Sequence, residues 1–457
     1  MTTVQDPERD PDALLAEPAR AEHLSAGRAL RLVLRRVHFL AGLAIAPFLA
    51  VLAVTGLMYA FTPQLNDLVY GDKLSVSEDT AIGATTAPVD DQVAAALAAH
   101  PDGALKSVIV SADPERTTRV VLDVPGLDTS GGPFGSEAMT VYVNPHTAAV
   151  QGELITVSNE PPLQRWLRDL HGNLNLGDPG RLYAEFVASW LPAIVLGGLV
   201  LWFAARRRKT KKAAAGRART SRWHGRVGVW AAIGLLVLSV TGLTWSTYAG
   251  ARVSDFVDAV DGRSPTLESA DVLPSAERIS LERALATARD GGLEGDLILT
   301  APTEPNRPLK INESSVGLPV QKDSVAVDQY TGAITGRVGW DDYPLMAKLT
   351  SLGIAAHSGN LFGIANQLLL AAVALAALAL LVLGYRMWWK RRPRSGGLAP
   401  APEPVWRRMP QPLVFGVLVV AAAVAWAMPV FGVTLLLFMI GDAAYGELRR
   451  RRRPQRV

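Results

Sequence analysis

The run Arg-Val-His-Phe-Leu-Ala-Gly at residues 36–42 opens the first long apolar segment, and its pattern returns as Arg-Trp-His-Gly-Arg-Val-Gly at residues 222–228. Both copies place a glycine 4 residues after the histidine. Both also reach a Thr-Gly pair 17 and 18 residues after that histidine, at 55–56 and at 241–242. Offsets that match at this many positions indicate an internal duplication.

A second histidine motif is duplicated as well. His171 is followed by glycine at offsets of 6 and 27 residues and by tryptophan at 31, and His357 is followed by the same residues at the same offsets. These residues are Gly177, Gly198 and Trp202 after the first histidine, and Gly363, Gly384 and Trp388 after the second. The sequence therefore predicts two halves, each of which supplies one histidine of each kind.

Composition restricts the class of protein and its chemistry. Of the 457 residues, 49% are hydrophobic and only 19% are charged, which favours several membrane spans with soluble inserts. The chain has no cysteine, so disulfides, thiolate zinc sites, iron–sulfur clusters and covalently attached c-type haem are excluded. Any metal or haem must be held by His, Met or carboxylate side chains.

Charge is segregated along the chain. Segment 62–182 contains 16 Asp+Glu against 7 Lys+Arg, and segment 251–350 contains 16 against 10, whereas basic residues cluster beside the apolar segments. An apolar helix of about 20 residues crosses a hydrocarbon core of about 30 Å, and cytoplasmic loops carry the excess of Lys and Arg. Both termini and the basic loop are therefore expected in the cytoplasm, and the two acidic inserts outside.

These patterns predict a polytopic α-helical membrane protein with four core spans as two pseudo-repeats, a C-terminal two-helix hairpin and two α+β extracytoplasmic inserts. Pro429 is expected to break the hairpin. The predicted boundaries are a disordered tail 1–27, spans 28–61, 183–204, 227–250 and 357–389, inserts 62–182 and 251–356, a basic loop 205–226, a linker 390–412, the hairpin 413–446 and a basic tail 447–457.

Each insert carries short periodic segments typical of an α+β domain. In the first insert the expected elements are a helix at 92–100 and strands at 106–111, 119–124 and 139–144. In the second insert they are a helix at 281–289 with Ser280 as its N-cap, and strands at 297–300 and 324–328.

The basic loop 205–226 has no acidic residue. Such a run can bind nucleic acid, but between two membrane spans it indicates a topology determinant in contact with anionic lipid. No nucleic-acid partner is expected.

The four duplicated histidines are the candidate cofactor ligands. Polar side chains at membrane depth are costly and mark functional sites, although a single histidine at a helix end is usually interfacial. A bis-imidazole site needs one histidine from each of two facing helices, which a duplicated chain supplies. We expect His38 with His224 at the cytoplasmic edge and His171 with His357 at the outer edge, as ligands of haem iron. About 30 Å of bilayer would separate the pairs, so one porphyrin cannot bridge them.

Gly42 and Gly228 lie on the same helical face as the first histidine of each half. Their missing side chains would let a flat macrocycle lie against the backbone, or would serve close packing between helices. The other histidines, His23, His100 and His146, have no duplicated partner and are interpreted as surface residues.

The chain lacks the motifs of nucleotide and metalloprotease sites. No G-x-G-x-x-G follows a strand, and neither a P-loop nor H-E-x-x-H occurs. An electron donor must therefore be another molecule, either a membrane quinol or a cytoplasmic flavoprotein.

The sequence resembles the bacterial membrane proteins with a PepSY-associated transmembrane region over roughly residues 30–395. The likeness is carried by Arg-Val-His at 36–38, Thr-Gly-Leu at 55–57, Leu-His-Gly-Asn-Leu-Asn-Leu-Gly-Asp-Pro-Gly-Arg at 170–181, Trp-His at 223–224, Thr-Gly-Leu-Thr-Trp-Ser at 241–246, His-Ser-Gly-Asn-Leu-Phe-Gly at 357–363 and Trp-Trp at 388–389.

The resemblance implies that each insert is a PepSY-like domain. The signature hairpin of such domains is similar to Val-Asp-Gln-Tyr-Thr-Gly at 327–332 in the second insert. The first insert departs from it, because Asn-Pro-His-Thr-Ala at 144–148 has no turn glycine.

Members of this family include inner-membrane reductases of ferric siderophores that carry b-type haem on membrane histidines. The resemblance thus implies a ferric reductase in the bacterial cytoplasmic membrane, with one or two haem b groups, which reduces a ferric siderophore or other chelate at the outer face for iron uptake. The alternative is a non-enzymatic PepSY protein that regulates an extracytoplasmic peptidase or assists metal uptake through carboxylates of the inserts.

Overall fold

A computed structural model describes residues 24–77, 85–130, 135–206, 215–314, 320, 322–393, 397, 399, 401–405 and 408–451. The predictions for tail residues 1–23, for residues 207–214 of the basic loop and for residues 452–457 lie outside these ranges. The chain divides into two compact units, one of Met1–Ala44, Ala193–Arg226 and Leu383–Val457, the other of Ile45–Pro192 and Val227–Val382. Each unit is described by itself.

Five of the described helices are long and apolar enough to cross a membrane, so the chain is a multi-pass helical membrane protein. These are α1 (Ala26–Ala60), α6 (Asp178–Arg206), α7 (Ala215–Leu243), α11 (Ile364–Trp389) and α13 (Pro429–Arg451). A shorter apolar helix, α12 (Gln411–Ala427), precedes α13, and the break between them falls directly before Pro429. A proline cannot continue the hydrogen-bond ladder of the preceding helix, which explains the break.

Short helices flank the long ones, and they shift two predicted boundaries. They are α2 (Thr62–Leu74), α5 (Pro162–Asn173), α8 (Tyr248–Ala259) and α10 (Leu345–Ser358). The third long helix ends at Leu243 rather than at the predicted residue 250. The predicted fourth span, 357–389, is divided, because Gly359 and Gly363 adopt positive φ angles of 87° and 56° between α10 and α11.

Two long helices contain a proline, and each proline leaves one carbonyl without its helical donor. In α1 the proline is Pro47, and the carbonyl of Leu43 accepts a hydrogen bond of 3.2 Å from the Tyr385 hydroxyl of α11. In α6 the proline is Pro192, and the carbonyl of Ala188 accepts a bond of 2.6 Å from the Ser239 hydroxyl of α7. Side chains of neighbouring helices thus satisfy both carbonyls, as an apolar environment requires.

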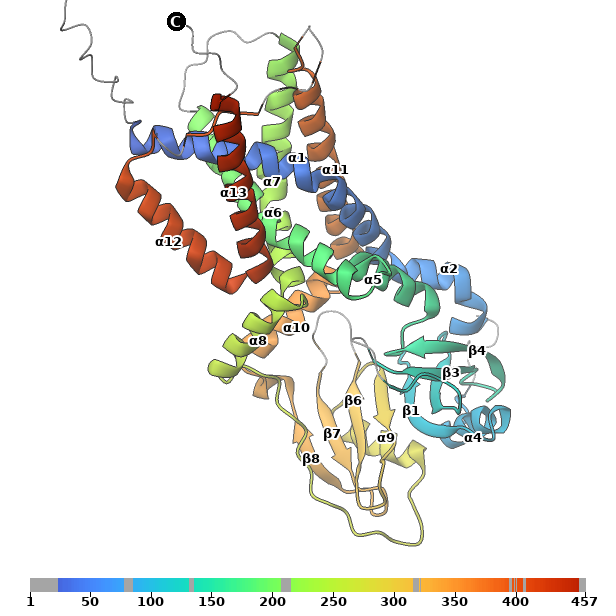
Figure 1. Ribbon diagram of the computed structural model, residues 1–457. Coiled ribbons are helices and arrows are strands. Elements are labelled where there is room, and N and C mark those ends of the chain that lie inside the picture. The colour runs from blue at the N-terminus through green and yellow to red at the C-terminus, as the bar shows by residue number, and fades with distance from the viewer. Residues whose placement is uncertain are drawn as a thin grey trace, which may run out of the picture. The chain divides into compact units, whose positions relative to one another are not determined.

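The two inserts contribute to one antiparallel sheet of eight strands among the described residues (Figure 1). Its order is β4-β3-β2-β1-β5-β6-β7-β8, so the strands of each insert form one half. The strands are β1 (Ala104–Val110), β2 (Thr118–Asp123), β3 (Glu137–Val143), β4 (Val150–Val157), β5 (Leu297–Thr300), β6 (Leu309–Glu313), β7 (Ser324–Val327) and β8 (Ile334–Val338). The first strands of the two inserts pair at the centre, with Val108 opposite Leu299 and Ile109 opposite Ile298.

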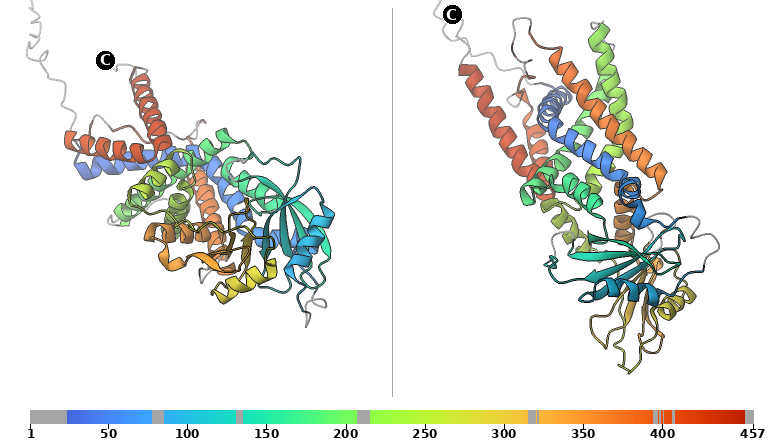
Figure 2. Two further views of the ribbon diagram at one scale, coloured as in Figure 1. Left: turned by 90° about the horizontal axis from the view of Figure 1, so that it is seen from below. Right: turned by 90° about the vertical axis from the view of Figure 1, so that its right-hand side faces the viewer.

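One helix from each insert packs on the same face of this sheet (Figure 2). Side chains of both helices complete the main hydrophobic core of the sheet. These helices are α4 (Val89–Ala99) and α9 (Leu281–Asp290). Their first turns cap each other. The Asp90 carboxylate accepts bonds from the backbone N–H groups of Leu281 and Glu282 at 2.8 and 3.0 Å, and the Glu282 carboxylate accepts one from Val89 at 3.1 Å. Carboxylates at helix N-termini are stabilising, so the caps strengthen the contact between the inserts.

The hairpin turn of the first insert, at residues 144–148, contains no glycine but has the same form as the turn at residues 328–332 of the second insert. Asn144 Oδ1 accepts bonds from the backbone N–H groups two and three residues later, as Asp328 Oδ1 does in the second insert. The turn closes with Ala148 at φ 53° in the first insert and with Gly332 at φ 78° in the second. The first insert therefore builds the turn with an alanine in a left-handed conformation that glycine adopts more readily.

Two histidine pairs as the candidate functional site

The four duplicated histidines lie in two pairs. In one unit, His38 of α1 and His224 of α7 have ring centres 6.3 Å apart, with their planes at 86°. In the other unit, His171 of α5 and His357 of α10 have ring centres 6.4 Å apart, with their planes at 57°. The structure thus brings each histidine together with the partner that the duplicated motifs predict.

Threonine hydroxyls hold the second pair. Thr55 Oγ1 lies 3.0 Å from Nδ1 of His171, and Thr241 Oγ1 lies 2.7 Å from Nδ1 of His357. Each hydroxyl also donates its hydrogen to the carbonyl four residues earlier in its own helix, at 2.9 Å for Thr55 and 2.7 Å for Thr241. A threonine hydroxyl has one hydrogen, so a hydroxyl that donates it to the carbonyl accepts from the imidazole. In that arrangement both rings carry their proton on Nδ1, and the lone pair of each ring is on Nε2.

A backbone carbonyl holds His38 in the same way. Its Nδ1 lies 2.8 Å from the carbonyl oxygen of Ile194 in α6, and a carbonyl can only accept. The ring proton of His38 is therefore on Nδ1 as well. Nε2 is again the nitrogen able to bind a metal.

Burial keeps the rings of the second pair neutral. Both rings belong to short helices outside the candidate spans. Burial lowers the pKa of His171 to about 4. Burial, together with the neighbouring His171 ring, lowers the pKa of His357 to about 3. A neutral imidazole is the form that binds metals, so both side chains are in this form at pH 7.

Each histidine ring packs against a glycine of another helix. A Cβ atom added at Gly198 would lie 2.9 Å from Cε1 of His38, and one at Gly384 would lie 3.9 Å from Cε1 of His224. In the other pair, a Cβ atom at Gly56 would lie 2.9 Å from Cε1 of His171, and one at Gly242 would lie 3.4 Å from Cε1 of His357. Any larger residue at Gly198 or Gly56 would push the ring out of position. These two glycines are thus required for close approach of the helices.

The glycines that the sequence favoured have different surroundings. A Cβ atom at Gly42 would meet no atom within 4 Å, and one at Gly228 would meet only Leu380 Cδ2, at 3.6 Å. Gly42 therefore has no close neighbour on another helix among the described residues. Neither glycine contacts a histidine ring.

A buried ion pair lies close in sequence to His38. Arg36 Nε donates to both carboxylate oxygens of Asp442 in α13, at 2.8 and 3.1 Å, and both residues are buried. The equivalent residue in the second half, Arg222, is exposed. The C-terminal hairpin thus buries only the first of the two duplicated arginines.

An aromatic residue, Trp245, lies beside the pair His171 and His357, with its ring centre 5.1 Å from that of His357.

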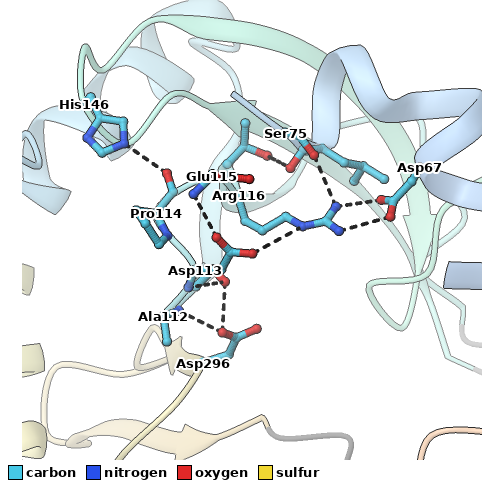
Figure 3. A network of polar contacts seen from close by, with 12 residues as sticks. Asp67, Ser75, Ala112, Asp113, Pro114, Glu115, Arg116, His146 and Asp296 are labelled. Atoms are coloured by element: carbon cyan, nitrogen blue, oxygen red, sulfur yellow. Dashed lines mark hydrogen bonds and ion pairs between the residues drawn. The ribbon is translucent and has the colours of Figure 1, made fainter. Parts of the chain in front are cut away.

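The unduplicated histidines take part in structural contacts of the inserts. His100 Nε2 lies 2.7 Å from the Glu153 carboxylate, and His146 Nε2 donates to the carbonyl of Pro114 at 3.0 Å. Figure 3 shows the latter contact beside Arg116, which pairs with both carboxylate oxygens of Asp67 at 2.6 and 3.0 Å. His23 lies outside the described residues. No group of three or more His, Asp or Glu side chains within the described residues could hold a metal ion.

Sequence reasoning left the threonines and glycines around the rings without a role. Thr55, Gly56, Gly198 and their copies in the second half had been identified only by their matching offsets. The structure gives each one a contact with a histidine from another helix. The signal in the sequence that could have indicated these contacts is the equal separation of Thr and His, which is 116 residues in both halves.

Comparison with known proteins identifies the family of the chain. No curated protein matches the chain. The family model described as PepSY-associated TM region matches residues 35–391, which include all four paired histidines. The C-terminal hairpin and its Asp442 lie beyond the matched region. Because the match covers well over half of its length, the chain belongs to the family of membrane proteins with a PepSY-associated TM region.

Proposed function

We propose that the chain is a transmembrane electron-transfer protein that holds non-covalent haem b between its paired histidines and reduces a ferric chelate at the outer face of the bacterial cytoplasmic membrane. The observation that carries this proposal is the separation of the ring centres within each pair, 6.3 and 6.4 Å. Two metal–imidazole bonds of about 2 Å each, with about 1 Å more from each ring nitrogen to its ring centre, put opposed ligands about 6 Å apart.

The protonation of the rings supports the same proposal. His38, His171 and His357 each have an oxygen within hydrogen-bond distance of Nδ1, so each ring would donate from Nδ1 and hold the iron through Nε2. The absence of cysteine leaves non-covalent haem as the form that can bind.

Haem would supply one-electron oxidation and reduction of its iron. The chain's own residues would ligate the iron, orient it and exclude water from it. In this proposal the core spans form two pseudo-repeats, each pair draws one histidine from each half, and both termini are cytoplasmic. Electrons would enter from a membrane quinol or a flavoprotein on the basic cytoplasmic side, and the acidic inserts would hold the ferric siderophore or other chelate outside.

The test is the visible spectrum of detergent-purified protein from haem-replete cells. We expect a b-type spectrum that dithionite reduces, because the paired imidazoles make low-spin haem. A variant with His38, His171, His224 and His357 all replaced by Ala should be colourless, while a His100→Ala, His146→Ala variant should keep its colour. A colourless wild-type protein that also takes up no added haem would contradict the proposal and favour a non-enzymatic PepSY protein.

A further inference from the structure

We infer that Thr55 and Thr241 are positioning residues, which fix the tautomer of His171 and His357 and thereby tune the redox potential of that one centre. The inference rests on the proposed function. It gives a role to the Thr-Gly pair that both halves repeat 17 and 18 residues after their first histidine.

The arrangement that we infer uses both hydrogen-bond contacts of each threonine hydroxyl. Each hydroxyl donates to the carbonyl of the residue four positions earlier, Val51 or Val237, and accepts from an imidazole of another helix at 3.0 or 2.7 Å. Because the hydroxyl already donates, its oxygen is polarised towards accepting. The Thr side chain thus holds the Nδ1–H tautomer on both rings of this pair.

The glycine of the pair completes the contact. A Cβ atom at Gly56 would lie 2.9 Å from Cε1 of His171, and one at Gly242 would lie 3.4 Å from Cε1 of His357. The Thr therefore orients the ring, and the adjacent Gly leaves room for it. Both contacts repeat with the same 116-residue separation of Thr and His, so the arrangement belongs to both halves.

The other pair uses a different acceptor. The Nδ1–H of His38 bonds to the backbone carbonyl of Ile194, which no side-chain substitution removes. An acceptor at Nδ1 raises the basicity of the ligand and so stabilises the oxidised metal. Removing the hydroxyl acceptors should therefore raise the potential of the His171–His357 centre and leave the His38–His224 centre unchanged.

The experiment compares Thr55→Val and Thr241→Val with the matched Thr55→Ser and Thr241→Ser variants. Redox titration of the haem spectrum should resolve two midpoint potentials in the wild-type protein. We expect each Val variant to shift one midpoint upward and change one low-spin EPR signal, and each Ser variant to restore both. Thr350→Val is the control, because Thr350 makes the same bond to a carbonyl four residues earlier, Met346 O at 2.8 Å, but its hydroxyl bonds to no histidine among the described residues.

Unchanged midpoints and EPR signals in Val variants that keep full haem would overturn the inference. If the Val variants do not accumulate, nitrogen NMR of the dithionite-reduced wild-type protein, labelled at histidine and assigned with His171→Gln and His357→Gln, decides instead. A proton on Nδ1 of both residues is expected, and a proton on Nε2 of either one would also overturn it. Wild-type protein without haem would contradict the proposed function itself, which is a separate outcome.

Discussion

At the scale of single residues, the two inserts solve one turn with different amino acids. Ala148 and Gly332 occupy the same position of equivalent hairpins, and both have positive φ. An L-residue in the left-handed region costs about 1 kcal/mol or more relative to the right-handed one, whereas glycine has no such penalty. The first insert is therefore less stable at this position than it could be.

Replacing Ala148 by Gly should stabilise the first insert by about 0.5–1 kcal/mol, because relief of the left-handed conformation exceeds the entropy that glycine adds to the unfolded chain. Gly332→Ala should destabilise the second insert by about 1 kcal/mol for the same reason. Thermal unfolding followed by circular dichroism measures both. Ala149→Gly is the control at a neighbouring position with ordinary φ, and a stabilisation there equal to that of Ala148→Gly would refute the argument.

The histidines show how far residue-level prediction reaches. The duplicated offsets were enough to pair His38 with His224 and His171 with His357, because a repeated motif places equivalent residues on equivalent helices. The offsets could not reveal that Thr55 holds His171, since a bond between residues 116 positions apart leaves no local pattern. The duplicated motif identified the histidines and paired them, but it did not identify the threonines that contact their rings.

At the scale of elements, both edge strands of the sheet escaped prediction. The predicted strands include β1, β2, β3, β5 and β7, whereas β4, β8 and the mostly buried interior strand β6 were missed. Strands β4 and β8 are the two edges of the sheet, and each has several exposed positions and a glycine. Edge strands have little need of an apolar face, so their sequences lack the alternation on which the prediction relied.

The exchanged helix caps should be measurable. Asp90→Ala leaves two N–H groups at the start of α9 without their acceptor, and loss of a cap costs about 1 kcal/mol, with a range of about 0.5–2. We expect chemical denaturation of the inserts to shift accordingly. Asp91→Ala removes a charge from the same turn but keeps both bonds, so it should have a much smaller effect. Equal losses in the two variants would show that net charge, not the cap, is responsible.

The two carbonyls that lose their helical donor to a proline, those of Leu43 and Ala188, allow a second test at the scale of elements. Tyr385→Phe removes one hydroxyl and leaves the carbonyl of Leu43 without its donor, and Ser239→Ala does the same at Ala188. Bonds between membrane helices contribute about 0.6 kcal/mol on average and up to about 1.7. Each variant should therefore unfold at a lower temperature in detergent. Tyr248→Phe is the matched control, because its hydroxyl bonds to no proline-freed carbonyl among the described residues, and a similar loss there would argue against the role of the freed carbonyls.

At the scale of the whole molecule, the charge distribution predicts the topology. Basic flanks place the termini and the loop 205–226 inside, and the acidic inserts outside. Since the chain has no cysteine, single cysteines at Ser130 and Ser314 are unique targets. Both should react with an impermeant thiol reagent on intact cells, and a cysteine at Ser221 should react only after lysis. Protection of both insert positions would reverse the assignment.

In the proposed arrangement, where each pair of histidines holds one haem, the pairing across halves predicts how variants would lose haem. His38→Ala and His224→Ala should each remove about half of the haem, and the double variant should lose no more, because both residues would serve one centre. His171→Ala and His357→Ala should behave likewise for the other centre, and loss of either centre should abolish reduction of an external ferric chelate. His100→Ala should have no effect. Additive losses from His38 and His224 would exclude a shared site.

The pairing of β1 with β5 has a consequence for ancestry. In a symmetric homodimer, the same surface of both subunits forms the interface, so residue i of one subunit contacts residue j of the other and residue j contacts residue i. Two identical strands that are related by a two-fold axis can form hydrogen bonds with each other only in the antiparallel direction. The β1–β5 pair is antiparallel, and Asp90 and Glu282 exchange caps across it. A half-length ancestor with such an insert would have joined its own copy along this strand. Gene fusion would then have made a homodimer permanent and freed each half to diverge.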